Sequence, residues 1–162
     1  MVKSYKLSGV TYDNENGKDI QREIAKILRK YVSEGLIDKE DMFLGYDNSD
    51  IKDMDICVSQ YENIAFNAKI KKDTFEGKTC VKVYIENADK KTYTHIGYIP
   101  KKHKQIQEVI DIINNNENIG LTLYVTGGKN KRCRVETDDE YNEKYYVETV
   151  ELTYGFNLFI EY

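Results

Sequence analysis

The sequence predicts an α+β fold in which an antiparallel, partly closed β-barrel carries two amphipathic helices. Strand-like and helical segments follow one another in the order β-α-β-β-β-β-α-β-β-β, with mostly short connections. Because strands do not alternate regularly with helices, a parallel doubly wound sheet is not expected. The 162 residues fit a single domain, and 14 Tyr and 5 Phe supply aromatic side chains for its core.

The N-terminal part of the chain predicts a strand, a turn and a helix. Tyr5–Tyr12 alternates β-compatible residues, with Gly9 marking a bend or bulge. After a turn-forming Asp-Asn-Glu-Asn-Gly run, apolar residues of Ile20–Tyr31 recur at helical spacing, with charged residues on the opposite side. Gly35 stands where a helix C-cap belongs. This pattern predicts an amphipathic helix that ends just before Gly35.

The middle of the chain predicts a loop and then a series of strands. Leu44–Asp55 is acidic and rich in turn-forming residues, so we expect a solvated loop there. Strands are expected after it at Ile56–Ser59, Ile64–Lys72, Thr79–Glu86 and Thr92–Ile99. Phe75–Gly77 breaks the alternation and predicts a turn between the second and third of these strands.

The C-terminal third predicts a second helix and further strands. Pro100 presets the first turn of a helix, and apolar residues from Ile106 to Ile113 give that helix one apolar face. The strands are expected at Leu121–Thr126, Tyr145–Leu152 and Phe156–Glu161. The first is expected to end in a hairpin turn at Gly127–Gly128, and the other two to pair across Thr153–Gly155. Basic residues that follow the glycine turn can contact a phosphate backbone: Lys129, Lys131, Arg132 and Arg134.

The charges are unevenly distributed along the chain. The 24 Lys and Arg against 28 Asp and Glu give a net charge of −4, which by itself speaks against a nucleic-acid ligand. Residues 34–62 hold nine acids and two lysines, a net −7, whereas residues 66–104 hold ten lysines and four acids, a net +6. The acidity is therefore concentrated in particular stretches, and the chain can still present a basic face.

Several classes of protein are disfavoured. No apolar run approaches the ~18 residues of a membrane-spanning helix, and the N-terminus lacks the apolar stretch of a signal peptide. Three widely spaced cysteines predict reduced thiols and a cytoplasmic protein. The aspartates of Asp47–Asp55 lack the central glycine and the alternating ligands of a calcium loop, so neither a metal nor a cofactor is expected. No nucleophile–base pattern is present, so we expect no catalytic residues and no enzyme activity.

The segment Tyr93–Lys104 is the strongest candidate for a binding site. A strand that carries aromatic side chains, Tyr98 among them, leads into a helix N-terminus flanked by Lys101, Lys102 and Lys104. Helix N-termini favour phosphate, aromatic faces stack on unpaired bases, and lysines contact the nucleic-acid backbone. The alternative is a core tyrosine beside a solvated basic first turn. The residues alone leave both interpretations open.

Around this segment the sequence resembles the HIRAN domain family. Val81–Asn87 and His95–Lys102 are similar to the core of the family, in which a strand is followed by an iGYiPk segment and a helix. Leu7–Tyr12 resembles the first strand of the family, Gly-Val-x-Tyr. The insertion that follows Tyr12 resembles the form found in bacterial members, where a helix comes after that strand.

The resemblance covers most of the chain and treats 1–162 as a single domain. The core lies at about 64–128, and the inserted helix and acidic loop lie at 17–55. Two C-terminal stretches, Leu123–Gly128 and Tyr154–Ile160, are also similar to bacterial members. The resemblance implies an OB-like barrel that binds DNA, in some members the 3′ end of a single strand.

The resemblance also implies roles for particular residues. Carried over by position, Tyr12 is a base-stacking aromatic, and Lys101 or Lys102 is a phosphate contact. Phe75 and Glu76 fall near the Asn-Pro-Tyr-Asp segment of the family, which helps to hold the strand end. That motif is absent from this chain, which reads Asp-Thr-Phe-Glu-Gly-Lys-Thr at the same place.

Two functions from different classes are therefore expected. The first is a non-catalytic nucleic-acid-binding module that recognises single-stranded DNA or DNA ends, beside a repair or mobile-element protein. Its expected contacts are Tyr12, Phe75, Tyr98, Lys101, Lys102, Lys104, Lys129, Lys131 and Arg132. The alternative is a protein-interaction module, in which the acidic residues of 34–62 bind a basic partner or inhibit a DNA-processing enzyme by mimicking DNA.

Overall fold

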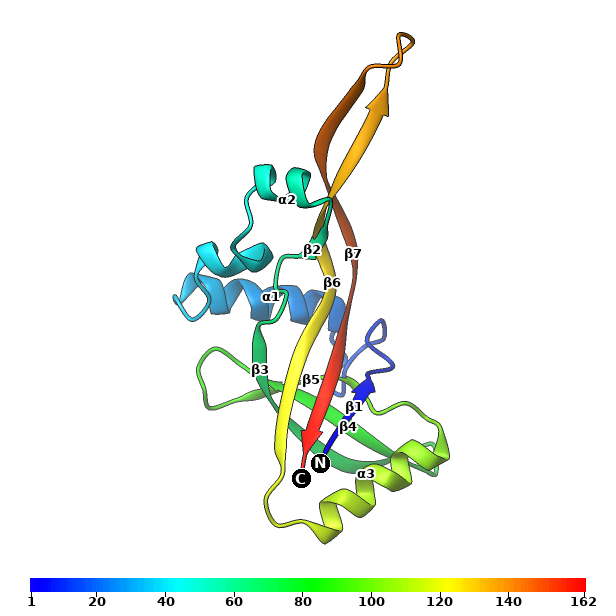
Figure 1. The fold of residues 1–162 in the computed structure, drawn as a ribbon. Coiled ribbons are helices and arrows are strands. Elements are labelled where there is room, and N and C mark those ends of the chain that lie inside the picture. Colours follow the sequence, from blue (N-terminus) through cyan, green and yellow to red (C-terminus); the bar gives the residue numbers. More distant parts are fainter.

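Two long strands from the C-terminal third of the chain are the centre of the fold. The computed structural model describes residues 1–162, and in it β6 (Gly120–Thr137) and β7 (Glu143–Glu161) pair antiparallel along their length (Figure 1). β1 (Val2–Lys6) pairs with the end of β7. β2 (Cys57–Ser59) and β3 (Ala65–Phe75) pair with different stretches of β6. All these pairings are antiparallel.

The sheet continues from β3 through a hairpin. β3 pairs with β4 (Lys78–Glu86), which pairs with β5 (Tyr93–Tyr98), so the order is β1-β7-β6-β3-β4-β5 with β2 beside β6. This confirms an α+β protein with an antiparallel sheet. The seven-stranded sheet is not closed into a barrel by hydrogen bonds. Its two edges meet at one antiparallel bridge only, where the backbones of Ser8 and Tyr98 exchange two hydrogen bonds of 2.9 Å.

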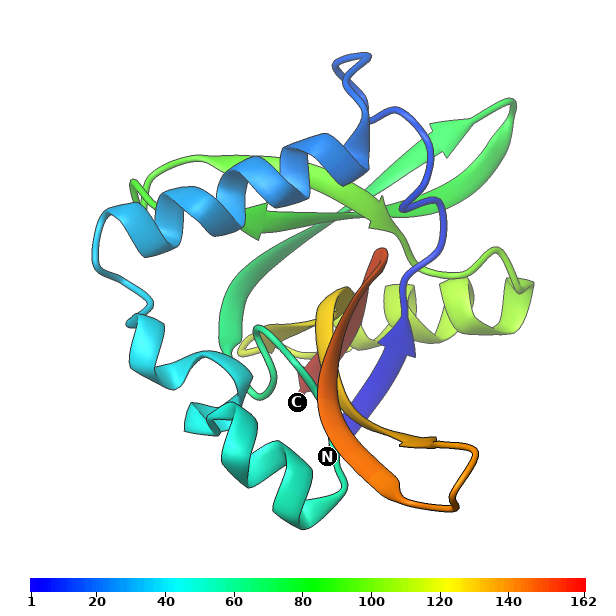
Figure 2. The same ribbon diagram turned by 90° about the horizontal axis from the view of Figure 1, so that it is seen from above.

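Two amphipathic helices cover the sheet at different levels. α1 (Ile20–Ser33) packs against β5 and β7, and α3 (His103–Asn115) packs against β4 near the two chain ends (Figures 1 and 2). α1 ends in a Schellman motif, because Gly35 takes a positive φ of 75° and the N–H of Leu36 donates to the carbonyl of Tyr31. The expected amphipathic helices, and the end of the first at Gly35, are confirmed.

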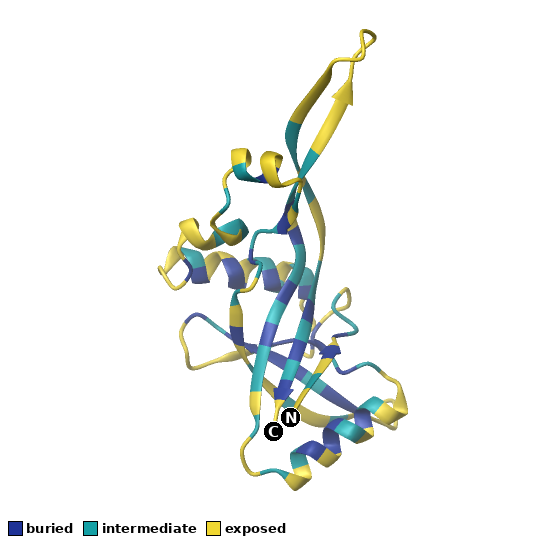
Figure 3. Ribbon diagram, viewed as in Figure 1, coloured by how far each residue is buried: buried dark blue, intermediate teal, exposed yellow.

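The core lies between the helices and the middle of the sheet. Buried side chains follow one face of each helix and the lower part of β6 and β7, whereas the far end of the β6–β7 ribbon is exposed (Figure 3). The centre is formed by side chains that are almost wholly buried: Ile20, Ile24, Leu28, Val83, Ile96, Leu123, Phe156, Leu158 and Ile160. The two chain ends lie side by side, since the Met1 ammonium donates to the carbonyl of Tyr162 at 2.6 Å.

Two predictions for the first half of the chain are wrong. The first strand is Val2–Lys6 rather than Tyr5–Tyr12, because the chain turns after Gly9 and the N–H of Tyr12 donates back to the carbonyl of Gly9. The expected acidic loop, Leu44–Asp55, contains a third helix, α2 (Asn48–Met54), and a 3₁₀ segment (η1, Lys39–Gly45) leads into it. α2 is short and polar, and it begins at a capping box in which Asp47 and Asp50 bond to each other's backbone N–H.

The predicted hairpins near the C-terminus are also wrong. β6 does not turn at Gly127–Gly128 but continues to Thr137, and β7 does not turn at Thr153–Gly155. The two glycine-containing stretches lie opposite each other, and the pairing register shifts between Thr126 and Gly128. Residues typical of turns therefore form a bulge that bends a continuous ribbon. Lys129, Lys131 and Arg132 consequently belong to a strand.

The bulge gives a test of this ribbon. Gly127 has a φ of +74°, and a Cβ placed there would lie 2.0 Å from the carbonyl oxygen of Thr153. We expect Gly127→Ala to lower the free energy of unfolding by about 4 kcal/mol or more, measured by urea denaturation. Gly17→Ala is the matched control, because Gly17 has the same φ but a Cβ placed there would have no neighbouring atom within 4 Å. Gly17→Ala should lower the free energy of unfolding by only about 1–2 kcal/mol, the cost of backbone strain. Equal decreases in both variants would contradict the close approach of the two strands at Gly127.

Candidate nucleic-acid interface

The β3–β4 hairpin and β5 share one face that points away from the core. The hairpin turns at Glu76 and Gly77, both with positive φ, so that Phe75 pairs with Lys78 and Lys71 with Lys82. Successive side chains in a strand point to opposite faces. We call the face opposite the core the outer face, and its side chains are Lys69, Lys71, Asp73, Phe75, Lys78, Cys80, Lys82, Tyr84, Glu86, Tyr93, His95 and Tyr98.

A bulge in β5 brings two rings onto this face. Lys82 pairs with Tyr98 and Tyr84 pairs with His95, which leaves Ile96 as the extra residue of β5. Without the bulge, His95 and Tyr98 would point to opposite faces, because they are three residues apart. Their rings instead meet edge to face, with centroids 4.8 Å apart, while Ile96 is fully buried in the core.

Lysines lie over aromatic rings at both ends of the outer face. The Lys69 ammonium is 5.9 Å from the ring centroid of Tyr84 and 5.8 Å from that of Tyr93. The Lys101 ammonium is 5.7 Å from the ring centroid of Phe75, which is 52% exposed. These are cation–π distances. The outer face therefore already combines positive charge with exposed aromatic surface.

Most lysines of this region have no acidic partner within the chain. Among the lysines of the outer face, only Lys82 is in an ion pair. The lysines that form none, on or beside the outer face, are Lys69, Lys71, Lys72, Lys78, Lys101, Lys102 and Lys104. Their uncompensated charge favours an anionic ligand.

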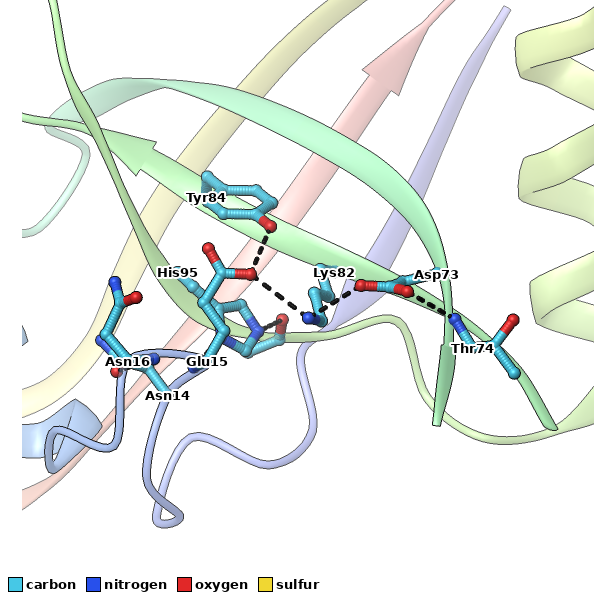
Figure 4. Close-up of polar contacts among 9 residues, drawn as sticks. Asn14, Glu15, Asn16, Asp73, Thr74, Lys82, Tyr84 and His95 are labelled. Atoms are coloured by element: carbon cyan, nitrogen blue, oxygen red, sulfur yellow. Dashed lines mark hydrogen bonds and ion pairs between the residues drawn. The ribbon is translucent and has the colours of Figure 1, made fainter. Parts of the chain in front are cut away.

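Lys82 lies between two carboxylates at the centre of the outer face (Figure 4). Its ammonium is 2.9 Å from Asp73 and 3.2 Å from Glu15, and the same oxygen of Glu15 accepts a hydrogen bond of 2.8 Å from the Tyr84 hydroxyl. The hydrogen bond with Asp73 raises the pKa of Lys82, and the bonds from Lys82 and from the Thr74 N–H lower the pKa of Asp73. Partial burial would raise the pKa of Glu15, but the bonds from Tyr84 and Lys82 outweigh it and lower that pKa.

His95 anchors the segment before α1 to the outer face. Its ring is 1% exposed, and its Nδ1 accepts a hydrogen bond of 3.0 Å from the backbone N–H of Glu15. Nε2 lies 3.0 Å from the carbonyl oxygen of Gly97, so it carries the proton and donates to that oxygen. Burial lowers the pKa of His95. The neutral ring satisfies both contacts, whereas a protonated ring loses the bond from Glu15.

The structure divides the sequence-predicted site residues into two groups. Tyr12, which is 68% exposed, and Tyr98 both lie close to Gly9, because a Cβ at Gly9 would be 3.6 Å from the Tyr12 ring and 2.9 Å from the Tyr98 ring. Phe75 and Lys101 lie together at the end of the β3–β4 hairpin. Lys102 is the N-cap residue of α3 without a side-chain cap bond, and Lys104 is exposed in its first turn. These residues form the first group.

The second group lies beside η1 and α2. The Lys131 ammonium is 4.4 Å from the ring centroid of Phe43 and 3.4 Å from Oδ1 of Asn48. Arg132 is paired with Glu148 at 3.0 Å, and Lys129 is exposed on the same strand. This part of β6 lies at the other end of the sheet from α3 (Figure 1). The structure therefore does not bring Lys129, Lys131 and Arg132 to the outer face.

The sequence did not single out several residues of the outer face, namely Lys69, Lys71, Lys78 and Tyr84, and it included Tyr93 only as part of the segment Tyr93–Lys104. The alternation of side chains between the two faces of β3 and β4 could have identified them. A two-residue turn at Glu76 and Gly77 makes Phe75 and Lys78 partners and fixes the register of the whole hairpin. Side chains at every second position then fall on one face, which is where the missed lysines and tyrosines lie.

Other kinds of site find less support. No group of three or more His, Cys, Asp and Glu side chains is arranged so that it could hold a metal ion. Burial raises the pKa of the Cys80 thiol, which disfavours a thiolate nucleophile. No helix combines the length and the apolar character that crossing a membrane requires.

Comparison with known proteins gives no relative for this chain. No protein-family model matches it, and neither a curated protein nor a solved structure has a significant match to it.

The environment of His95 predicts a pH dependence of stability. Above a pH of about 6.5, the ordinary pKa of histidine, the ring is neutral in both the folded and the unfolded state. As the pH falls from there through the lower pKa of the folded state, the unfolded chain binds a proton that the folded chain does not, so stability decreases. Urea denaturation between pH 7.5 and 5 should show a shallower loss in His95→Gln than in the wild type. His103→Gln, at an exposed position, is the control and should keep the wild-type slope.

Proposed function

We propose that this protein is a non-catalytic, HIRAN-like domain that binds single-stranded DNA or DNA ends through the outer face. One observation carries the proposal: lysines without acidic partners lie among exposed aromatic side chains where β3, β4, β5 and the start of α3 meet. Single strands are bound by this combination, because lysines contact phosphates and aromatic rings stack on bases. A face of this kind selects unpaired bases over a closed duplex.

The order and arrangement of the elements support the proposal that the domain is HIRAN-like and OB-like. β4, β5, Pro100 and α3 follow one another as the resemblance expects, and Tyr12 lies beside Tyr98. The bridge between Ser8 and Tyr98 brings the two sheet edges together, as in a partly closed barrel. The N-terminus of α3 directs its free backbone N–H groups toward the region of Lys101, where they can contact a phosphate.

The proposed contacts divide into two kinds. Lys69, Lys71, Lys78, Lys101 and Lys102 neutralise phosphates, and binding therefore weakens as salt is added. The exposed rings stack on bases and belong to Tyr12, Phe75 and Tyr93. Lys129, Lys131 and Arg132 are outside this interface in the proposal, because they lie beside η1 and α2.

A binding titration tests the proposal. With a 5′-labelled oligo-dT 12-mer at low salt, Phe75→Ala and Tyr12→Ala should each weaken binding by about 1–3 kcal/mol, the usual value for one stacked base. The double variant Lys101→Gln/Lys102→Gln should weaken binding and reduce the slope of log K against log salt by about 1.4, at about 0.7 per phosphate contact. Fluorescence anisotropy at several salt concentrations measures both effects.

Matched controls locate the interface. Lys129→Gln/Lys131→Gln removes the same charge from the second group, and Tyr141→Ala removes a ring that is 87% exposed at the far end of the β6–β7 ribbon. Both controls should bind like the wild type. Equal losses in the two lysine double variants would show a non-specific charge effect, and wild-type protein that binds no oligonucleotide at low salt would contradict the proposal. Oligonucleotides with free and blocked 3′ ends then test whether strand ends are preferred.

A second function, binding of a basic protein partner, is supported by the acidic segment 34–62. Its acidic residues in and around η1 and α2 form no ion pairs, namely Asp38, Glu40, Asp41, Asp47, Asp50, Asp53 and Asp55. This acidic surface can bind a basic DNA-processing enzyme in place of DNA. On this proposal the protein inhibits such an enzyme, and Asp41→Asn/Asp53→Asn/Asp55→Asn relieves the inhibition at least about tenfold. Inhibition that is unchanged in the triple variant would contradict it.

A further inference from the structure

A short segment folds over part of the outer face. We call residues 13–18, between Tyr12 and α1, the strap. Its shape is set by Asn14, whose side-chain oxygen accepts hydrogen bonds from the N–H groups of Asn16 and Lys18 at 2.9 and 3.1 Å. The base of the strap is closed by a bond of 3.1 Å from the Ile20 N–H to the Tyr12 carbonyl. This turn holds the side chain of Glu15 against the outer face (Figure 4).

The Glu15 carboxylate occupies a position suited to an external anion. One of its oxygens accepts hydrogen bonds from two side chains at once, the Lys82 ammonium at 3.2 Å and the Tyr84 hydroxyl at 2.8 Å. An ammonium and a hydroxyl that converge on one oxygen also suit a phosphate oxygen. The lysines around this point, Lys69 and Lys71 on β3, add positive charge without acidic partners.

We propose that Glu15 is an internal competitor for nucleic acid, and that a phosphate group of the bound strand takes its place on Lys82 and Tyr84. This inference rests on the proposed function, because it names the position on the outer face where a phosphate binds. The strap then lowers the affinity of the protein for nucleic acid, since binding requires the fraction of molecules in which Glu15 has left.

Few polar bonds hold the strap on the outer face. They are the carboxylate bonds to Lys82 and Tyr84 and the single backbone bond to His95. The Tyr12–Ile20 bond closes its base, so the tip can move while α1 and Tyr12 stay in place. Lys82 keeps Asp73 as a partner at 2.9 Å when Glu15 departs. The exchange therefore replaces one anion by another and leaves no unpaired ammonium.

Substitution of Glu15 tests the competition. With the 5′-labelled oligo-dT 12-mer, Glu15→Gln should bind about fivefold more tightly than the wild type or better, as expected when a partly buried charged contact is removed. Glu15→Ala, which removes both side-chain bonds, should show at least the same gain. The matched control is Glu140→Gln, because Glu140 is exposed at the far end of the β6–β7 ribbon and forms no ion pair.

The control separates competition from net charge. Removing one negative charge at Glu140 should change the affinity by less than about twofold, the effect of a distant screened charge. Equal gains in Glu15→Gln and Glu140→Gln would overturn the inference, and so would weaker binding by Glu15→Gln. Urea denaturation of each variant verifies that it is folded.

A second measurement does not depend on DNA binding. Pyrophosphate serves as the probe anion, and hydrogen exchange of the Glu15 backbone amide, which donates to His95, reports on the strap. Pyrophosphate should speed this exchange in the wild type, whereas potassium chloride at the same ionic strength should not. Unchanged exchange would overturn the inference even if the oligonucleotide binds. Faster exchange in a protein that binds no oligonucleotide would support the anion position and contradict the proposed function.

Discussion

The pairing of β6 with β7 is the constraint on which the rest of the structure depends. β1 pairs with β7, β2 and β3 pair with β6, and β4 and β5 are attached through β3. Their inward side chains, among them Leu123, Phe156 and Leu158, are wholly buried and form the surface on which α1 and α3 close the core. Because an isolated two-stranded ribbon is marginally stable in water, this apolar contact is what holds the two strands in one register.

That constraint also determines where a ligand can bind. β3 leaves β6 after three paired residues and continues into the hairpin with β4, so the hairpin and β5 extend beyond the ribbon with one face against the core. The opposite face is left to polar and aromatic side chains, as is usual for an antiparallel sheet with one wet face. The lysines therefore lie on this face because the sheet leaves it to polar side chains, and all of them except Lys82 form no ion pair.

Elements that are determined by nearby residues could be predicted from the sequence. Elements that depend on contacts with distant segments of the chain could not. The apolar spacing of Ile20–Tyr31 and the glycine after it define α1, because both act within a few residues. Gly127–Gly128 carries the same local signal in a hairpin and in a bulge, and only the strand opposite decides between them. α2 was missed because it is polar and buries only Ile51. At the candidate site, the resemblance suggested Phe75 and the lysine cluster before the second helix suggested Lys101, whereas Lys69 and Tyr84 required the cross-strand register.

The neighbouring chain ends have a consequence for the connectivity of the fold. Met1 and Tyr162 are in hydrogen-bonding contact, and β1 and β7 run side by side up to that point. The path of the backbone is therefore almost a closed ring, and a short peptide joining the two ends would leave every strand pairing intact. New ends could then be opened at the exposed turn around Tyr141, at the far end of the ribbon. We therefore expect the elements to keep their arrangement in space in such a circularly permuted chain.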